Sequence, residues 1–363
     1  MSTLLPGRPV LLLLAVAGLG LGALAGAAEA ATLNVANNGV DSGTCGAAAS
    51  PCRSISQAIA NASAGDRIVV GPGRYGDLDG DGAFTSAGEE APSVACSCMI
   101  KVDKAVTIES RAGAGATVLD AGGLPGTVVG ILASGVVFGR AKKGFTLTGG
   151  ISGLDVFSGT SGVSVAGNLA TANVNFGFFF DGSGHVGSGN AAHASNNGFY
   201  LRDSGHTLTG NLASGNVVGF AFEGSGHHLT GNVASANSAY GFSFVGSGHL
   251  LSSNVASAND QVGVFAQAGS GHVFSGNAVH GNGVGTAWAG TGTLSKNNLY
   301  GNGNCGMNNQ SGSAIDARNN FWGAATGPGA DPADNVCNFG AGSSTTTAPF
   351  STKESPVKSR PLF

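Results

Sequence analysis

The sequence predicts an all-β chain that folds as a single-stranded right-handed parallel β-helix, with three short strands per coil and an N-terminal capping helix. The first observation is an asparagine that recurs at Asn168, Asn190, Asn211, Asn232, Asn254 and Asn277. The second is that short apolar runs alternate with Asn-Gly-Ser clusters typical of turns. The third is that a period near 22 residues is too short for a propeller blade or a helix pair.

Equal positions of successive units should stack about 4.8 Å apart along such a solenoid. One inward column is then expected from the residue three before each asparagine, namely Leu208, Leu229, Leu251 and Phe274. The pairs Phe220/Phe222 and Phe242/Phe244 should form another inward column. An asparagine at each turn tolerates a left-handed backbone and can hydrogen-bond its copy in the next coil.

Three further stretches carry a family resemblance: SPCRSISQAI over residues 50–59, GDRIVVGPGRY over 65–75, and NNFWG over 319–323. With the repeats, they resemble bacterial secreted right-handed β-helix proteins of the pectin-lyase-like superfamily. The resemblance covers nearly the whole mature chain. It implies the fold and leaves the function open, because that superfamily includes lyases, hydrolases and adhesins.

Residues 1–30 have the pattern of an export signal, with Arg8 before an apolar core over 10–24 and Ala28-Glu29-Ala30 at the cleavage site. A membrane anchor is the alternative, but the apolar run is short and rich in small residues. The mature chain is therefore expected to be secreted or periplasmic, without a membrane span. Its net charge of −4 offers no basic surface for nucleic acid.

The remaining chain divides into one domain and a tail. Residues 31–342 are expected to form the β-helix, with regular coils over about 161–309, and residues 343–363 a flexible tail. A helix over residues 54–62, with Ser54 as its cap, should cover the open end of the solenoid.

Six cysteines in an exported chain favour disulfides. The expected pairs are Cys45–Cys52 and Cys305–Cys337. For Cys96 and Cys98, a strained bond across one residue, the reduced state and cross-pairing remain open. A metal site is the rival interpretation, although paired Cys-x-x-Cys spacing is missing.

An acidic insertion is the first candidate site. Asp77, Asp79 and Asp81 alternate and end in a glycine, as in the first half of a calcium loop. The twelfth position holds Gly88, and Glu89 follows it, so Glu89 is the candidate fourth ligand. Calcium would stiffen the loop; the alternative is a solvated acidic turn.

A histidine column is the second candidate, formed by His185, His206, His227, His249 and His272, each in Ser-Gly-His. Imidazoles one coil apart are close enough to share zinc or copper. The repeat type resembles that of a periplasmic copper-associated family of β-helix proteins. The alternative is a structural histidine that bonds to the backbone, stacks on its copies and even faces inward.

An acid column is the third candidate, with Asp181, Asp203 and Glu223 on adjacent coils and Arg202 beside them. The pectinolytic resemblance implies that such carboxylates hold calcium in a lyase or act as an acid and base pair in a hydrolase. The Asn-Thr-Asp, Asp-Asp and Arg-Ile-Lys signatures of the hydrolases are missing, however. Polar residues that end a strand are the alternative.

Aromatic side chains are the fourth candidate. By alternation along the strand, Phe179, Tyr200 and Phe265 should face outward, and exposed aromatic rings on a flat sheet can stack on sugars. They can also pack under a loop or against a second subunit. Two functions follow: a non-catalytic exported β-helix that binds polysaccharide or has a cell-envelope role, and a polysaccharide lyase or hydrolase. A periplasmic metal-binding accessory protein is a further alternative.

Overall fold

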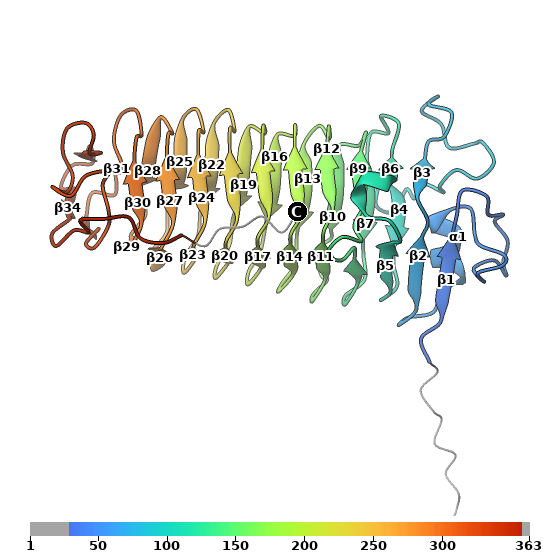
Figure 1. Cartoon of the computed structure of the whole chain (residues 1–363). Coiled ribbons are helices and arrows are strands. Elements are labelled where there is room, and N and C mark those ends of the chain that lie inside the picture. The colour runs from blue at the N-terminus through green and yellow to red at the C-terminus, as the bar shows by residue number, and fades with distance from the viewer. Residues whose placement is uncertain (1–28, 358–363) are drawn as a thin grey trace, which may run out of the picture. The chain divides into compact units, whose positions relative to one another are not determined.

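The computed structural model describes residues 29–357, so all but the last two residues of the predicted export signal lie outside the described residues. From Ala31 onward the chain forms one unit, a parallel β-solenoid. Its strands build three sheets of 13, 11 and 10 strands, which are seen as successive coils in Figure 1. The predicted fold class is confirmed, and the one α-helix of the described residues is α1 (Ile55–Asn61).

Each coil contributes strands to the three sheets in turn. The thirteen-stranded sheet contains β1 (Thr32–Val35), β2 (Arg67–Val70), β5 (Thr107–Ser110), β8 (Val137–Phe138), β11 (Ser164–Ala166), β14 (Val186–Ser188), β17 (Thr207–Thr209), β20 (His228–Thr230), β23 (Leu250–Ser252), β26 (His272–Ser275), β29 (Gly292–Ser295), β32 (Ala314–Asp316) and β34 (Ser344–Thr346). The eleven-stranded sheet contains β4 (Cys98–Val102), β7 (Thr127–Ile131), β10 (Ser152–Val156), β13 (Phe176–Phe180), β16 (Asn197–Leu201), β19 (Val218–Phe222), β22 (Tyr240–Phe244), β25 (Val262–Ala266), β28 (Val284–Trp288), β31 (Met307–Asn309) and β33 (Val336–Asn338). The ten-stranded sheet contains β3 (Gly73–Gly76), β6 (Thr117–Asp120), β9 (Thr146–Thr148), β12 (Leu169–Thr171), β15 (Ala191–His193), β18 (Leu212–Ser214), β21 (Val233–Ser235), β24 (Val255–Ser257), β27 (Ala278–His280) and β30 (Asn298–Tyr300). A short 3-10 turn, η1 (Ala114–Ala116), precedes β6.

The predicted inward columns form the core. Leu208, Leu229 and Leu251 are paired in register across β17, β20 and β23, and all three side chains are buried. On the next sheet the rings of Phe199 and Phe220 stack with their centroids 4.7 Å apart. Because like residues meet at every rung, each column buries a continuous apolar stripe, which is what stabilises a solenoid.

A ladder of buried asparagines fixes one turn of each coil. The side-chain nitrogen of Asn232 donates to the Leu208 carbonyl (2.9 Å) and to the Asn254 side-chain oxygen (3.0 Å). The Asn232 side-chain oxygen in turn accepts from the backbone and side-chain nitrogens of Asn211, both at 2.9 Å. The predicted bond to the copy in the next coil is therefore present. The left-handed backbone lies one residue before the asparagine, as at Gly231 (φ 67°), where glycine adopts it without a steric cost. The asparagine that follows directs its side-chain amide into the coil.

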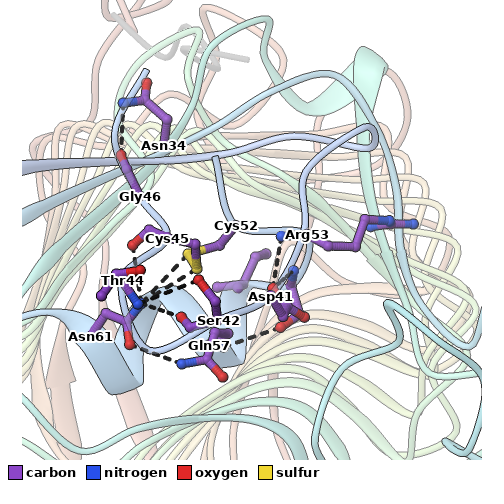
Figure 2. The surroundings of a disulfide bond; sticks show 12 residues. Asn34, Asp41, Ser42, Thr44, Cys45, Gly46, Cys52, Arg53, Gln57 and Asn61 are labelled. Atoms are coloured by element: carbon purple, nitrogen blue, oxygen red, sulfur yellow. Dashed lines mark hydrogen bonds between the residues drawn. A yellow bond between two sulfur atoms is a disulfide. The ribbon is translucent and has the colours of Figure 1, made fainter. Parts of the chain in front are cut away.

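The helix α1 and the first disulfide close the N-terminal end of the unit. Ser54 caps α1 by accepting a hydrogen bond from the Gln57 backbone nitrogen (3.1 Å), as predicted. Figure 2 shows Asn61, at the end of α1, donating to the Cys45 carbonyl (3.0 Å) beside the Cys45–Cys52 disulfide. The helix thereby shields apolar residues of the first coils from water.

Two further disulfides are present, Cys305–Cys337 as predicted and Cys96–Cys98. The paired structure extends past the predicted domain end at residue 342. Strand β34 pairs with β32, although it lies within the segment expected to be a flexible tail. The backbone nitrogen of Ser355 also donates to the Asn298 side chain (2.8 Å), so this part of the segment is bonded to the solenoid.

Candidate functional site

The histidine column faces the interior. The rings of His206, His227 and His249 are buried and stack with centroids 5.1 Å apart, nearly parallel. In each ring Nε2 lies beside a carbonyl four residues earlier; for His227 this is the Glu223 oxygen at 2.6 Å. Nδ1 of the same ring accepts a hydrogen bond from the His206 backbone nitrogen at 3.3 Å. Both ring nitrogens are therefore used within the fold.

These histidines are neutral. Burial lowers the pKa of His206, His227 and His249 to about 4, against an ordinary value of 6.5. Burial also lowers the pKa of His185 and His272. A metal ligand needs a free nitrogen lone pair, which the bonded rings of His206 and His227 lack. The geometry thus favours the structural interpretation of this column over a shared zinc or copper ion.

The acid column differs from the predicted set by one residue. Asp181, Arg202 and Glu223 each follow the last residue of a strand in the eleven-stranded sheet, and their backbones bond from coil to coil. Asp203 lies one residue further on, in the turn, with a φ of 67°. Its carboxylate accepts a hydrogen bond from the Gly182 backbone nitrogen (3.1 Å). In the strand register Arg202 stands between Asp181 and Glu223, while the Gly182 backbone nitrogen also donates to Asp181 (3.1 Å), so the carboxylates of Asp181 and Asp203 share this donor.

The predicted aromatic residues share one column on the outer face of the eleven-stranded sheet. Phe179 pairs with Tyr200, and Phe265 follows after the small residues Ala221 and Ser243. Phe179, Tyr200 and Phe265 are all half-buried.

Phe176 joins this surface, because it also lies outward at the start of β13. Its ring stacks on Tyr200 with centroids 5.1 Å apart and lies 5.2 Å from Phe179. We call Phe176, Phe179 and Tyr200 the aromatic platform. The sequence analysis missed Phe176, because strict alternation from Phe179 places a residue three positions earlier on the inner face, whereas the strand register skips Gly177.

Charged side chains surround the aromatic platform. The Arg202 guanidinium lies 5.3 Å from the centre of the Phe179 ring and 3.5 Å from an Asp181 oxygen. The Tyr200 hydroxyl donates to Glu223, and burial together with this bond raises the pKa of Tyr200. The platform therefore combines partly exposed aromatic rings with hydrogen-bond donors and acceptors at its edge.

Asp155 is a second residue that the sequence analysis missed. It precedes Phe179 in the same outward column, and burial raises the pKa of its carboxyl to about 6. Thr127 donates to one carboxyl oxygen, while the other is buried without a hydrogen bond. Its coil lacks the Ser-Gly-His signature, so only counting the register back from Phe179 could have placed it here.

The acidic insertion brings together three of its four predicted ligands. Oxygens of Asp77, Asp79 and Glu89 lie within 4.8 Å of one another. Asp77 is fully buried and accepts from the backbone nitrogens of Gly80 (2.7 Å) and Gly82 (3.0 Å). Asp81 is outside this group, and its carboxylate accepts from the Ala83 backbone nitrogen. An all-oxygen set of this kind suits a hard cation such as calcium.

The fold and the aromatic surface define an exported parallel β-helix protein of the pectin-lyase-like type. The family described as "Periplasmic copper-binding protein (NosD)" matches residues 140–330, and the chain belongs to this family. This confirms the predicted location outside the cytoplasm. None of the helices in residues 29–357 is long and apolar enough to cross a membrane. A comparison with curated protein sequences found no significant match.

Several solved structures share the fold at low sequence identity. A rhamnogalacturonan lyase has a TM-score of 0.57 at 12% identity, with 88% of each chain covered. The pectate lyase Pel9A has a TM-score of 0.55 at 15% identity, with 91% of this chain and 82% of that chain covered. The A-module of the mannuronan C-5 epimerase AlgE6 from Azotobacter vinelandii has a TM-score of 0.52 at 16% identity, with 78% and 91% covered. These similarities confirm the pectin-lyase-like fold.

The described residues do not offer a copper site. All six cysteines are in disulfides, and both Met99 and Met307 are fully buried. In the histidine column both ring nitrogens of His206, His227 and His249 have hydrogen-bonding contacts to the backbone, whereas Nδ1 of His272 is buried without a hydrogen-bond partner and is in none of the converging groups of potential ligands in residues 29–357. Two groups of potential metal ligands converge among the described residues. One includes the disulfide-bonded Cys45 and Cys52, and the other is the all-oxygen set of Asp77, Asp79 and Glu89, which is unsuited to copper.

Proposed function

We propose that the protein is a non-catalytic exported solenoid that binds a polysaccharide on the aromatic platform. The observation that carries this proposal is the cluster of three outward rings, 5.1 to 5.4 Å apart, on a flat sheet. Aromatic faces bind the apolar faces of sugar rings, and nearby polar groups orient the hydroxyls. The names of the similar structures, which are lyases and an epimerase of polysaccharides, support the same class of ligand.

The surface beyond the platform suits an extended ligand. Ala221 and Ser243 occupy the next two rungs of the column, and the Tyr240 and Phe265 rings follow, 5.5 Å apart. From Tyr200 to Phe265 is three rungs, or about 14 Å along the solenoid. Small residues between two aromatic groups leave a low strip on which several sugars of one polymer can lie.

Replacing the central ring is the direct test. Tyr200→Ala is expected to weaken glycan binding at least ~10-fold. Stacking of a sugar ring on one partly exposed aromatic ring contributes on the order of 1 kcal/mol or more, and Glu223 also loses its hydrogen-bond partner. Tyr200→Phe should keep the stacking and lose less. Binding is measured on a glycan array and then by calorimetry on the polymers it selects.

Phe339→Ala is the matched control, because Phe339 is an exposed aromatic residue that follows β33, six strands away from β16 in the same sheet. It should bind as the unaltered protein does. Equal affinities for Tyr200→Ala and the unaltered protein would remove the platform as the binding site.

A polysaccharide lyase or hydrolase is the second candidate, supported by Asp181 and Glu223 beside the platform. Their carboxylates are engaged, Asp181 with Arg202 and Glu223 with Tyr200, which favours a binding role. The assay follows unsaturated-uronate absorbance on pectic and alginate polymers. Turnover that disappears in Asp181→Asn would replace the binding proposal with an enzymatic one.

We also infer a structural calcium ion in the acidic insertion, held by Asp77, Asp79 and Glu89. Millimolar calcium is expected to raise the midpoint of thermal unfolding by several degrees, because an ion that binds only the folded state stabilises it. Asp79→Ala should abolish this shift, whereas Asp260→Ala, at an exposed aspartate in a regular coil, should retain it. A shift that persists in Asp79→Ala would place the ion elsewhere.

A metal-binding accessory role is a third candidate, and its support is the description of the family. Elemental analysis of the purified protein tests it. Stoichiometric copper that survives dialysis would favour this role over glycan binding.

A further inference from the structure

A cluster of cations lies on the thirteen-stranded sheet near its N-terminal end, around one buried acid. Glu109, on β5, is 1% exposed, and three cations converge on its carboxylate. Lys143 Nζ lies 3.0 Å from one oxygen, which Arg67 also contacts, and Arg140 Nε lies 3.2 Å from the other. Burial raises the pKa of Glu109, but the hydrogen bonds from Arg67 and Lys143 outweigh it and hold the carboxylate ionised.

Two more cations extend this cluster. The Arg111 guanidinium donates to the Asn34 side chain (3.1 Å), and Asn34 stands in the same outward column as Glu109. Lys142 is adjacent to Lys143 and exposed. We call Arg67, Arg111, Arg140, Lys142 and Lys143 the basic cluster; these are five of the 16 lysines and arginines of the chain. With Glu109 the charge is 5 − 1 = +4.

The basic cluster holds more positive charge than its acid can balance. One carboxylate needs one cation, whereas Arg67, Arg140 and Lys143 all approach Glu109 and keep 41%, 56% and 45% of their side chains exposed. Like charges held together oppose folding unless a counter-ion is present. Arg67 and Arg140 each contact Glu109 through one nitrogen, which leaves their other guanidinium N–H donors without a protein partner among the described residues. The buried acid thus fixes a set of cations in advance of binding.

The arrangement of the cluster indicates the kind of anion. Its side chains come from or follow β2, β5 and β8, which are successive strands about 4.8 Å apart, so their points of attachment span about 10 Å along the solenoid, with Glu109 on the middle strand. Arginine forks match carboxylates in a bidentate geometry. We propose that the basic cluster is a second binding site, which takes a linear anionic polysaccharide with carboxylates repeated along its chain. This site lies on a different sheet from the aromatic platform and does not rest on the function proposed for that platform.

The test measures binding of polygalacturonate to the mature protein by calorimetry at low and at physiological salt. The double variant Arg140→Ala/Lys143→Ala leaves Arg67 to pair with Glu109 and should bind at least ~10-fold more weakly, with a smaller salt dependence. Arg140→Gln/Lys143→Gln, which keeps more of each stem, serves if the alanine pair fails to fold. The control Lys296→Ala/Arg318→Ala removes two exposed cations elsewhere and should change the affinity less than about twofold.

Four results would overturn the proposal. The first is that polygalacturonate does not bind at low salt, and the second is that the control and the cluster variants weaken binding equally. The third is that the cluster variants bind as tightly as the unaltered protein. The fourth is that the protein binds vesicles of anionic phospholipid in place of the polymer. Tyr200→Ala separates the two sites. It should leave polygalacturonate binding at the basic cluster intact, and loss of all binding in that variant alone would assign the polymer to the platform.

Discussion

Acidification from pH 6.5 to about 4 is expected to remove much of the stability of the regular coils. The buried histidines His206, His227 and His249 have a pKa of about 4 in the folded chain and about 6.5 when unfolded. Between these values the unfolded state binds protons that the folded state does not. The free energy of unfolding therefore decreases as the pH is lowered. The loss approaches roughly 3 kcal/mol per histidine at the acid limit.

The hydrogen bonds explain why this loss is large. Protonation at Nδ1 of His227 would place a second donor against the His206 backbone N–H, where an acceptor is needed. It would also put charges on rings stacked 5.1 Å apart. Asp155 acts in the opposite sense, because its pKa is raised to about 6 and its protonated form is favoured on folding. One such carboxyl offsets about one histidine of the column.

Urea unfolding followed at pH 7.5, 5.5 and 4.5 measures the effect. His227→Leu should flatten the pH dependence, since it removes one titrating group from the column. His228→Ala is the control, because His228 is the exposed neighbour of His227 and should leave the dependence unchanged. Midpoints that are the same at pH 7.5 and 4.5 would show that the column does not control acid stability.

The second large effect is expected from Asn232→Ala. This change removes the acceptor of two buried Asn211 donors and the donor to the buried Leu208 carbonyl. Each orphaned buried group costs about 1–3 kcal/mol, so the expected total for the three groups is at least roughly 3 kcal/mol. Native-state hydrogen exchange should show the loss concentrated in the coils next to residue 232, because each coil contacts only its neighbours.

Asn196→Ala gives the matched comparison, because Asn196 is an exposed asparagine. Its backbone carbonyl accepts a hydrogen bond from the Val218 backbone nitrogen, and this bond does not depend on the side chain. Its stability should change by less than about 0.5 kcal/mol. Similar losses in the two variants would mean that the asparagine ladder adds no more than any polar residue on the coil.

Much of the solenoid could be predicted because its repeats are nearly equal in length. Leu208, Leu229 and Leu251 are separated by 21 and 22 residues, and parallel in-register stacking then brings like positions together. The outward position of Tyr200 and Phe179 followed from alternation along the strand. The inward position of His206, which is the structural alternative for the histidine column, follows in the same way because His206 lies two residues before the buried Leu208.

The acid column could not be predicted from spacing alone. The coil from Asn168 has one residue more than the next coil, in the turn between Thr171 and Phe176, so counting from the asparagine placed Asp203 instead of Arg202 in register with Asp181. Arg202 is the residue in register with Asp181 and Glu223, and its guanidinium contacts Asp181 (3.5 Å). A turn absorbs such an insertion without disturbing the strands on either side of it, and the sequence does not say which residue the turn takes up.

The sequence by itself determined the architecture and which repeated residues meet, since a constant period in a parallel stack leaves one register that buries the apolar stripe. The tertiary structure decided what those residues can do. Burial and hydrogen bonding turned His227 from a candidate metal ligand into a neutral structural group. Folding gathered Arg67, Arg140 and Lys143, which are up to 76 residues apart in the chain, around Glu109. Solvent exposure and long-range proximity depend on how the coils stack, and no single repeat carries that information.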